Sequence, residues 1–279
     1  MIIDTHVHIF DPSRPEGVPW PDSENQLLYR TTLPEQVKAQ AMPEGVEGVV
    51  VVEASEWVED NQWVLDIAKD DPFILGLVGR LEPNDEHFER DLNRFSADPI
   101  FQGIRFWGGY FENVEQGDFI DKMRRVAERG LVVDVNFPWK TADGFFALQE
   151  KVPDLKIVLE HVSGVTVNGG PPSDEWMENM RRAAEHPQTT MKVSALMENC
   201  VEQPAPAAAG YYKPALDAMW EIFGEERLFY GSNWPVCERA GTYARCIRTV
   251  RMYFAGKGME ATEKFFWRNS QAVYGWKER

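Results

Sequence analysis

Short apolar runs recur along this chain of 279 residues, and each is followed by a longer segment with helical spacing. Eight of the runs have the length and the Val and Ile content of buried strands. Several are apolar at consecutive positions, which indicates strands that are covered on both faces. The predicted strands are Ile2–His8, Gly48–Glu53, Ile74–Leu81, Gly103–Phe106, Val132–Phe137, Ile157–His161, Thr190–Ala195 and Leu228–Gly231.

The segments between these runs place apolar residues on one helical face, as Trp63, Val64 and Ile67 do within 60–70. The predicted helices are Asp60–Asp70, Asp85–Phe95, Phe119–Arg129, Thr141–Lys151, Trp176–His186, Tyr212–Phe223, Arg245–Phe254 and about Ala261–Ala272. Asp11–Thr32 and Glu202–Gly210 are rich in Pro with Gly or Ala, and we expect both to be long loops.

Strands that alternate with helices predict right-handed βαβ units around a parallel sheet. Eight such units favour a closed (β/α)8 barrel over an open sheet, and a barrel commonly uses this chain length as a single domain. The sequence lacks a glycine-rich dinucleotide fingerprint and a phosphate-binding P-loop. The expected fold is therefore α/β, a distorted (β/α)8 TIM barrel in one domain of residues 1–279.

The charge balance excludes several classes of partner. The net charge is −16, which argues against nucleic acids and anionic membranes because both bind clustered Lys and Arg. No apolar stretch approaches the length of a membrane span, and no signal peptide precedes the first strand. Three cysteines, with no CxxC pair, indicate a reducing compartment. We expect a cytoplasmic protein with a small-molecule substrate; the sequence does not indicate an oligomeric state.

His6 and His8 stand two residues apart near the end of the first predicted strand, so both rings point to the same side of it. Neutral imidazole is the commonest protein metal ligand and an acid or base near neutral pH. A His-x-His pair also occurs by chance, and the chain has only five histidines. The pair gains weight from the residues at the other strand ends.

In a barrel, the residues at the carboxyl ends of the strands converge on one mouth. Polar side chains there are costly unless they are paired or used. This chain places many of them at such positions: His6, His8, Glu53, Arg105, Asp134, Asn136, Glu160, His161, Lys192, Ser194 and Asn233.

Six motifs in order along the chain resemble the amidohydrolase-related branch of the amidohydrolase superfamily, close to sugar-acid lactonases and 2-pyrone-4,6-dicarboxylate lactonase. They are Ile3-Asp-Thr-His-Val-His-Ile-Phe-Asp-Pro12, Val50-Val-Val-Glu-Ala-Ser55, Gly103-Ile-Arg105, Val158-Leu-Glu-His161, Met191-Lys-Val-Ser-Ala195 and Arg227-Leu-Phe-Tyr-Gly-Ser-Asn-Trp-Pro-Val-Cys237. The resemblance spans nearly the whole chain. It implies a (β/α)8 fold and hydrolysis of a lactone C–O bond.

The chain departs from this family at a central position. The family residue that matches Asn233 is usually Asp, which takes a proton from the attacking water. An amide has no usable base. The residue that matches Glu53 is often Gln in the family, and here it is an acid. We therefore hypothesise that Glu53 supplies the negative charge that Asn233 lacks.

The resemblance leaves metal dependence open, because some members are zinc-dependent and the pyrone-dicarboxylate enzyme is thought to work without a metal. His6 and His8, with Glu53 or His161, would give a divalent ion such as zinc an open site for water. In a metal-free pocket the same histidines would donate hydrogen bonds to the lactone carbonyl. Both alternatives stay open.

Arg105 is predicted to bind a substrate carboxylate through its planar fork, or else to pair with Glu53, Asp134 or another barrel acid. Arg80 is expected to be structural. Lys192 is expected to be solvated or ion-paired rather than a base. Three further residues are predicted to contact substrate: Trp107, Asn136 and Trp234. Tryptophans at strand ends are also often plain packing.

The function predicted from these observations is a hydrolase that opens a small carboxylated or polyhydroxylated lactone. The histidines would stabilise the oxyanion, and Glu53 or His161 would take the proton. The predicted catalytic residues are His6, His8, Glu53, His161 and Asn233. Two alternatives remain: a metal-dependent decarboxylase or hydratase on the same fold, and a barrel that has lost hydrolytic activity because of Asn233.

Overall fold

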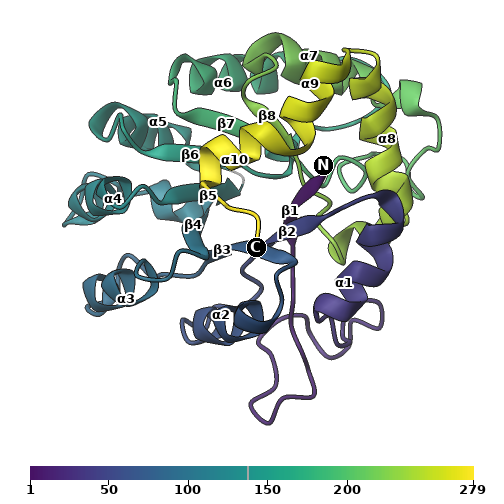
Figure 1. Cartoon of the computed structure of the whole chain (residues 1–279). Helices are drawn as coiled ribbons and strands as arrows, with labels where there is room; N and C mark the ends of the chain where they lie inside the picture. Colours follow the sequence, from purple (N-terminus) through teal and green to yellow (C-terminus); the bar gives the residue numbers. More distant parts are fainter. Residues whose placement is uncertain (137) are drawn as a thin grey trace.

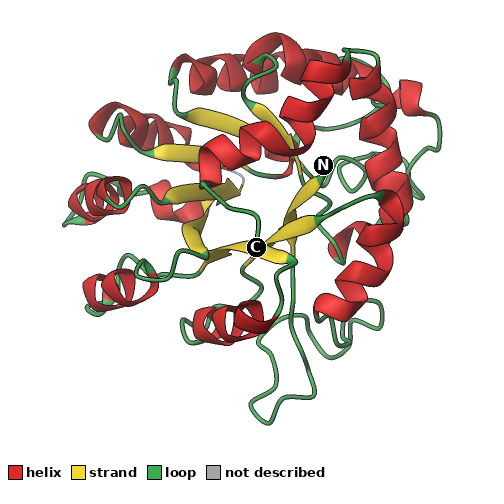
Figure 2. Ribbon diagram, viewed as in Figure 1, coloured by secondary structure: helices red, strands yellow, loops and turns green. Residues whose placement is uncertain are grey.

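Eight parallel strands follow one another around a barrel in the computed structural model, which describes residues 1–136 and 138–279. Each strand pairs with the next one along the chain, and the helices form a ring outside them (Figures 1 and 2). The strands are β1 Ile3–Val7, β2 Gly48–Val52, β3 Ile74–Gly79, β4 Phe101–Trp107, β5 Val132–Asn136, β6 Lys156–Leu159, β7 Thr189–Val193 and β8 Leu228–Tyr230. The predicted (β/α)8 barrel is confirmed.

The α-helices are α1 Pro34–Ala41, α2 Asp60–Asp70, α3 Phe88–Phe95, α4 Phe119–Glu128, α5 Ala142–Lys151, α6 Asp174–Glu185, α7 Lys213–Phe223, α8 Tyr243–Ala255, α9 Met259–Glu263 and α10 Asn269–Tyr274. Short 3₁₀ turns occupy η1 Met42–Glu44, η2 Gly108–Phe111, η3 Pro138–Thr141, η4 His161–Gly164, η5 Ala209–Tyr211 and η6 Val236–Arg239. A π-helical turn, η7 Lys264–Arg268, joins α9 to α10, so the last predicted helix is three elements.

Helix α2 was predicted from the sequence with its observed bounds, whereas helix α1 was not predicted. In α2, Val64, Leu65 and Ala68 are buried on one face. Helix α1 has eight residues and buries only Pro34, Val37 and Ala41, so its apolar periodicity is too short to stand out. The long loop expected between β1 and α1 projects at the bottom of Figure 1.

The barrel closes through residues just beyond the last strand. Strand β8 has only three residues, but the backbone N–H of Asn233 donates to the carbonyl of His6 over 2.9 Å. The N–H of His8 in turn donates to the carbonyl of Trp234, also over 2.9 Å. Register shifts interrupt the first three strand pairs, as expected for a distorted barrel. This closure places Asn233 directly beside the His6 and His8 pair.

The amino-terminal end of the barrel is filled with apolar side chains. The strand residues Ile3, Val132 and Phe229 pack there against Tyr274 and Trp276 from the end of the chain. Figure 1 shows α10 and the carboxyl-terminal tail lying across this end. The carboxyl ends of the strands therefore provide the open end of the barrel, where active sites of this fold form. Among the described residues, no helix combines the length and apolar character needed to cross a bilayer.

Candidate active site

A cavity of about 690 Å³ opens at the carboxyl ends of the strands. Its volume falls within the range of small-molecule sites. Its polar wall combines imidazoles, carboxylates, guanidinium groups and amides from several strand ends and the loops that follow them: His8, Glu53, Ser55, Glu56, Arg80, Arg105, Asn136, His161, Glu198, Asn199, Asn233 and Arg239. Trp20, Trp107 and Tyr110 add aromatic faces.

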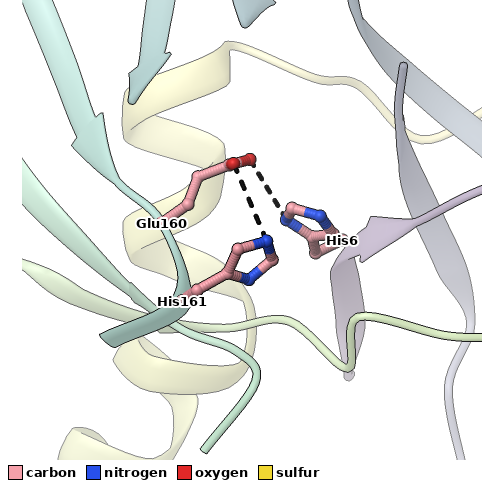
Figure 3. A group of neighbouring side chains, drawn as sticks. All are labelled: His6, Glu160 and His161. Carbon is pink, nitrogen blue, oxygen red and sulfur yellow. Dashed lines mark ion pairs between the residues drawn. The ribbon is translucent and has the colours of Figure 1, made fainter. Parts of the chain in front are cut away.

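Three buried side chains lie together near the carboxyl ends of β1 and β6: those of His6, Glu160 and His161 (Figure 3). One atom of each lies within 4.8 Å of one atom of the others. His6 Nδ1 is 3.2 Å from Glu160 Oε1, and His161 Nε2 is 3.9 Å from Glu160 Oε2. Neither ring nitrogen of His6 forms a hydrogen bond to another described residue, and neither does Glu160 Oε1. Two imidazoles and a carboxylate are ligand types that zinc takes, so the chemistry of this group fits a zinc-type cation.

The protonation states suit a ligand role. Burial lowers the pKa of His6 well below its ordinary value and that of His161 to about 3, so both rings are neutral near pH 7. Burial alone would raise the pKa of Glu160, but Arg105 and His6 hold it well below its usual range. The group therefore carries one carboxylate charge and two neutral imidazoles.

Arg105 is held by acids of the barrel, as the structural alternative expected. Its Nε donates to Glu160 Oε2 over 2.7 Å, and its Nη1 lies 3.5 Å from Glu53 Oε1. Its Nη2 is 3.1 Å from His161 Nε2. The guanidinium also lies 4.7 Å from the centre of the Trp107 ring, which is 46% exposed and lines the cavity. Binding of a substrate carboxylate by Arg105 stays a prediction.

The predicted metal set of His6, His8, Glu53 and His161 is brought together only in part. Glu53 accepts a hydrogen bond from the backbone of Ser55 at Oε2 and faces Arg105 at Oε1. His8 contacts the carbonyl of Val52 through Nδ1 at 3.0 Å. Both residues lie outside the close donor group, in which Glu160 joins His6 and His161.

His8, Asn233 and Glu198 form a second constellation on the cavity wall. His8 Nε2 lies 3.3 Å from Asn233 Oδ1, and Asn233 Nδ2 donates to Glu198 Oε1 over 2.9 Å. Burial lowers the pKa of His8 to about 4 and raises that of Glu198 to about 7. The sequence prediction missed Glu198, because it lies five residues beyond β7. An acid in a loop that follows a strand was the signal available.

Buried hydrogen bonds and ion pairs hold these strand ends in position. Asp4 accepts hydrogen bonds from the backbone N–H of Ser232 and the hydroxyl of Tyr243, over 2.8 and 2.9 Å, which ties β1 to the segment after β8. Lys192 is fully buried and donates to Asp134 Oδ2 over 2.6 Å. The expectation of an ion-paired lysine is confirmed.

The structure does not bring Trp234 to the cavity wall, and its predicted contact with substrate stays untested. The side chain is 2% exposed, and its indole N–H donates to Glu238 over 2.8 Å. Asn233 has a left-handed φ of +63° and lines the cavity, whereas the next residue, Trp234, packs in the core. Asn136 does line the cavity, and its Oδ1 accepts no hydrogen bond from the described residues.

Arg80, Tyr110, Arg239 and Trp20 also line the cavity, and the sequence had assigned none of them to a site. Arg80 donates to Glu82 over 2.9 Å and to Tyr110 over 2.6 Å, which agrees with its expected structural role. The polar ends of these side chains reach the mouth from loops whose paths depend on tertiary packing. Arg80 stands near the end of a predicted strand, but no strand-end position marked Trp20, Tyr110 or Arg239.

Several known proteins are similar to this chain in sequence or in fold. The chain is 26% identical over 247 residues to an L-fucono-1,5-lactonase of Burkholderia ambifaria, across 86% of this chain and 82% of that protein. Its fold matches a zinc-bound amidohydrolase of Burkholderia multivorans with a TM-score of 0.86 at 19% identity, covering 99% of this chain and all of the other. It also matches a probable 2-pyrone-4,6-dicarboxylic acid hydrolase of Acinetobacter baumannii, crystallised with citric acid, with a TM-score of 0.78 at 17% identity over 98% of this chain and 99% of the other.

The family model described as amidohydrolase matches residues 3–276, which include every strand of the barrel and all the residues that form the cavity wall. The expected family resemblance is thereby confirmed, and the chain belongs to the amidohydrolase family.

Proposed function

We propose that this protein hydrolyses the ring ester of a small, neutral, polyhydroxylated lactone. The observation that carries the proposal is the cavity of about 690 Å³, whose polar wall lies beside the buried His6, Glu160 and His161 group. The similarity to a protein named L-fucono-1,5-lactonase supports the reaction class.

Two of the three arginines of the wall are paired with acids, which favours a neutral substrate over a carboxylated one. Arg105 is paired with Glu160 and Glu53, and Arg80 is paired with Glu82. The chain as a whole carries a net charge of −16, which repels anions. Hydroxyl groups of a sugar lactone would instead find both donors and acceptors among the wall amides, including Asn136 and Asn199.

His6, Glu160 and His161 are the residues that would hold a divalent metal, which we propose to be zinc. A bound ion of this kind polarises a carbonyl oxygen and makes bound water more acidic. The side chains of this protein would orient the substrate around that centre. Arg105 holds Glu160 as a carboxylate and fixes its direction, and Trp107 covers the guanidinium on the cavity side.

The proposed function can be tested by assaying purified protein against a panel of lactones while following proton release. We expect turnover of six-carbon sugar-acid lactones and little turnover of a pyrone dicarboxylate. An aromatic carboxylate, assayed for CO₂ release, covers the decarboxylase alternative. Absence of turnover with every lactone would contradict the proposal, and exclusive turnover of the dicarboxylate would contradict the assigned substrate class.

The metal is tested separately by measuring zinc content and affinity. We expect about one zinc ion per chain, lost in the His6→Ala variant and retained in the His186→Ala variant. His186 directly follows helix α6 and is not among the residues that line the cavity. Unchanged zinc content in His6→Ala would refute the assigned ligands.

The location in the cytoplasm that the three free cysteines suggest stays a prediction.

A further inference from the structure

Hydrolysis of an ester by water needs a group that takes a proton from the attacking water. Most basic side chains of the cavity wall are already engaged. His161 contacts Ser194 through Nδ1 at 3.0 Å and Arg105 through Nε2 at 3.1 Å. Glu53 has one oxygen against Arg105 and the other on the backbone of Ser55.

The remaining wall carboxylates are Glu56, which is exposed, and Glu198, which is partly buried and hydrogen-bonded to Asn233. We propose that Glu198 takes the proton of the attacking water, which makes it a catalytic residue for the lactone hydrolysis proposed above and the functional replacement for an acid at Asn233.

The surroundings of Glu198 leave it able to change its charge. Its carboxylate accepts a hydrogen bond from Asn233 Nδ2 over 2.9 Å and is also favoured by its own backbone N–H. The charged or titratable groups that act on it or respond to it are Arg239 and Cys237 from η6 and Cys200 from its own loop. The charge of Arg239 lowers the pKa of Glu198 and is the smallest of the influences on it. Burial outweighs these attractions and raises the pKa of Glu198 to about 7, the range in which a general base is most effective.

The hydrogen-bond chain from Val52 to Glu198 favours proton uptake. With Glu198 ionised, Asn233 Nδ2 donates to it, and Asn233 Oδ1 and the Val52 carbonyl both face the ring of His8. A neutral imidazole has only one N–H, so one of these two acceptors stays unsatisfied.

Protonation of Glu198 removes this conflict. A half-turn of the Asn233 amide then lets the carboxylic acid donate to Oδ1, while Nδ2 donates to His8 Nε2. The remaining N–H of His8, on Nδ1, donates to the Val52 carbonyl. Each link of the chain then has one donor and one acceptor, which explains how Asn233 can assist the reaction without being a base itself.

The chemical step conserves atoms and charge. The water oxygen forms a bond to the lactone carbonyl carbon, one water proton passes to the Glu198 carboxylate, and the carbonyl oxygen becomes an oxyanion. The bond from this carbon to the ring oxygen then breaks and the carbonyl re-forms. The ring oxygen takes the proton back from Glu198, which leaves a hydroxy acid that ionises in water.

The test compares Glu198→Gln, Glu198→Asp, Glu53→Gln and the control Glu202→Gln on the best lactone of the panel. Glu202 is an exposed acid of the same loop. We expect Glu198→Gln to lower kcat by about 100-fold or more, with KM within about threefold, since general bases contribute factors of this size. It should also abolish the fall in rate below pH 7. Glu198→Asp should keep that fall with an intermediate kcat, Glu53→Gln should keep it, and Glu202→Gln should match the wild type.

The outcomes separate this assignment from the proposed function. If the wild type opens no lactone, both fail together. If the wild type is active and Glu198→Gln keeps kcat within about threefold with the same pH profile, the assignment to Glu198 alone is overturned. Equal kcat and equal loss of the pH dependence in the Asp and Gln variants would also overturn it, because a shortened carboxylate retains a base. Circular dichroism of each variant checks that it is folded.

Discussion

Replacing Lys192 with Met should strongly destabilise the protein, because it leaves two buried carboxylates without their shared cation. Lys192 Nζ lies 2.6 Å from Asp134 Oδ2 and 3.7 Å from Glu160 Oε1, and all three side chains have 0% exposure. Removing one partner of a buried ion pair typically costs about 3–5 kcal/mol of unfolding free energy. Methionine retains the length and much of the volume of lysine, so a packing defect contributes little.

The size of this loss should depend on pH, because Asp134 can escape its unpaired charge by binding a proton. Burial already raises the pKa of Asp134 to about 7, and the loss of Lys192, which opposes this shift, would raise it further. The folded variant then binds a proton that the unfolded chain releases near its ordinary value of 3.8. Its stability therefore falls with rising pH, by about 1.4 kcal/mol per unit while the folded group stays protonated. The destabilisation should be larger at pH 8 than at pH 6.

The assay is urea unfolding followed by tryptophan fluorescence at both pH values, for Lys192→Met, Asp134→Asn and the double variant. The amide introduced by Asp134→Asn would retain an acceptor for the hydroxyl of Tyr274, which donates to both Asp134 oxygens over 2.8–2.9 Å. The double variant should be more stable than the sum of the two losses predicts. The control is Lys213→Met, at an exposed ion pair with Asp217, where a change below about 1 kcal/mol is expected. Additive losses in the double variant, or a loss below about 1 kcal/mol for Lys192→Met at pH 8, would refute the reasoning.

Three further predictions follow from single contacts. Burial raises the pKa of Glu198 from 4.5 to about 7, so its ionised form destabilises the fold above pH 7 and not below pH 4.5. In urea unfolding, the free energy of unfolding of Glu198→Gln should therefore exceed that of the wild type by on the order of 2–3 kcal/mol at pH 8 and equal it near pH 4.5. Equal free energies of unfolding at both pH values would be inconsistent with that pKa. Trp107→Ala should raise KM about tenfold with kcat within a factor of three, since the ring forms an exposed cavity face over Arg105, and an unchanged KM would exclude that role. Gly231→Ala would place a Cβ 2.7 Å from the Cβ of His6; it should lower the unfolding free energy by about 1–3 kcal/mol and weaken zinc binding, and a fully stable variant with normal zinc affinity would contradict the close packing.

The barrel was predictable because its strands are buried on both faces and so are read as continuous apolar runs. Strand β2 was expected at Gly48–Glu53 and is observed at Gly48–Val52. Helix α1 was not predictable in this way, since two of its three buried residues are Pro and Ala, which carry little apolar signal. The closing contacts from Asn233 to His6 lie beyond the last strand, where no periodicity predicts hydrogen bonds.

The candidate site was predictable as a set of positions and not as a set of partners. A position at the end of a strand indicates that the side chain lies at the mouth of the barrel. Which other side chains it contacts there depends on strand register and on side-chain length. Arg105 is in register with Asp134 on the adjacent strand, yet its long side chain passes over that residue to Glu160, which directly follows β6. Asp134 pairs instead with Lys192, two strands further along the barrel.

The same reasoning explains why Glu53 was the expected acid and Glu198 is the better placed one. Glu53 directly follows β2 and was visible from its position, but its Oε1 faces Arg105 at 3.5 Å and its Oε2 accepts from the backbone of Ser55. Glu198 follows β7 only after a turn in which Ala195 has a φ of +52°, a conformation that few side chains adopt and that sequence patterns do not reveal. That turn, together with the barrel closure beyond β8, brings Glu198 to Asn233. An acid missing from one strand end is thus replaced from a neighbouring loop, and the replacement is identified only when both paths of the chain are known.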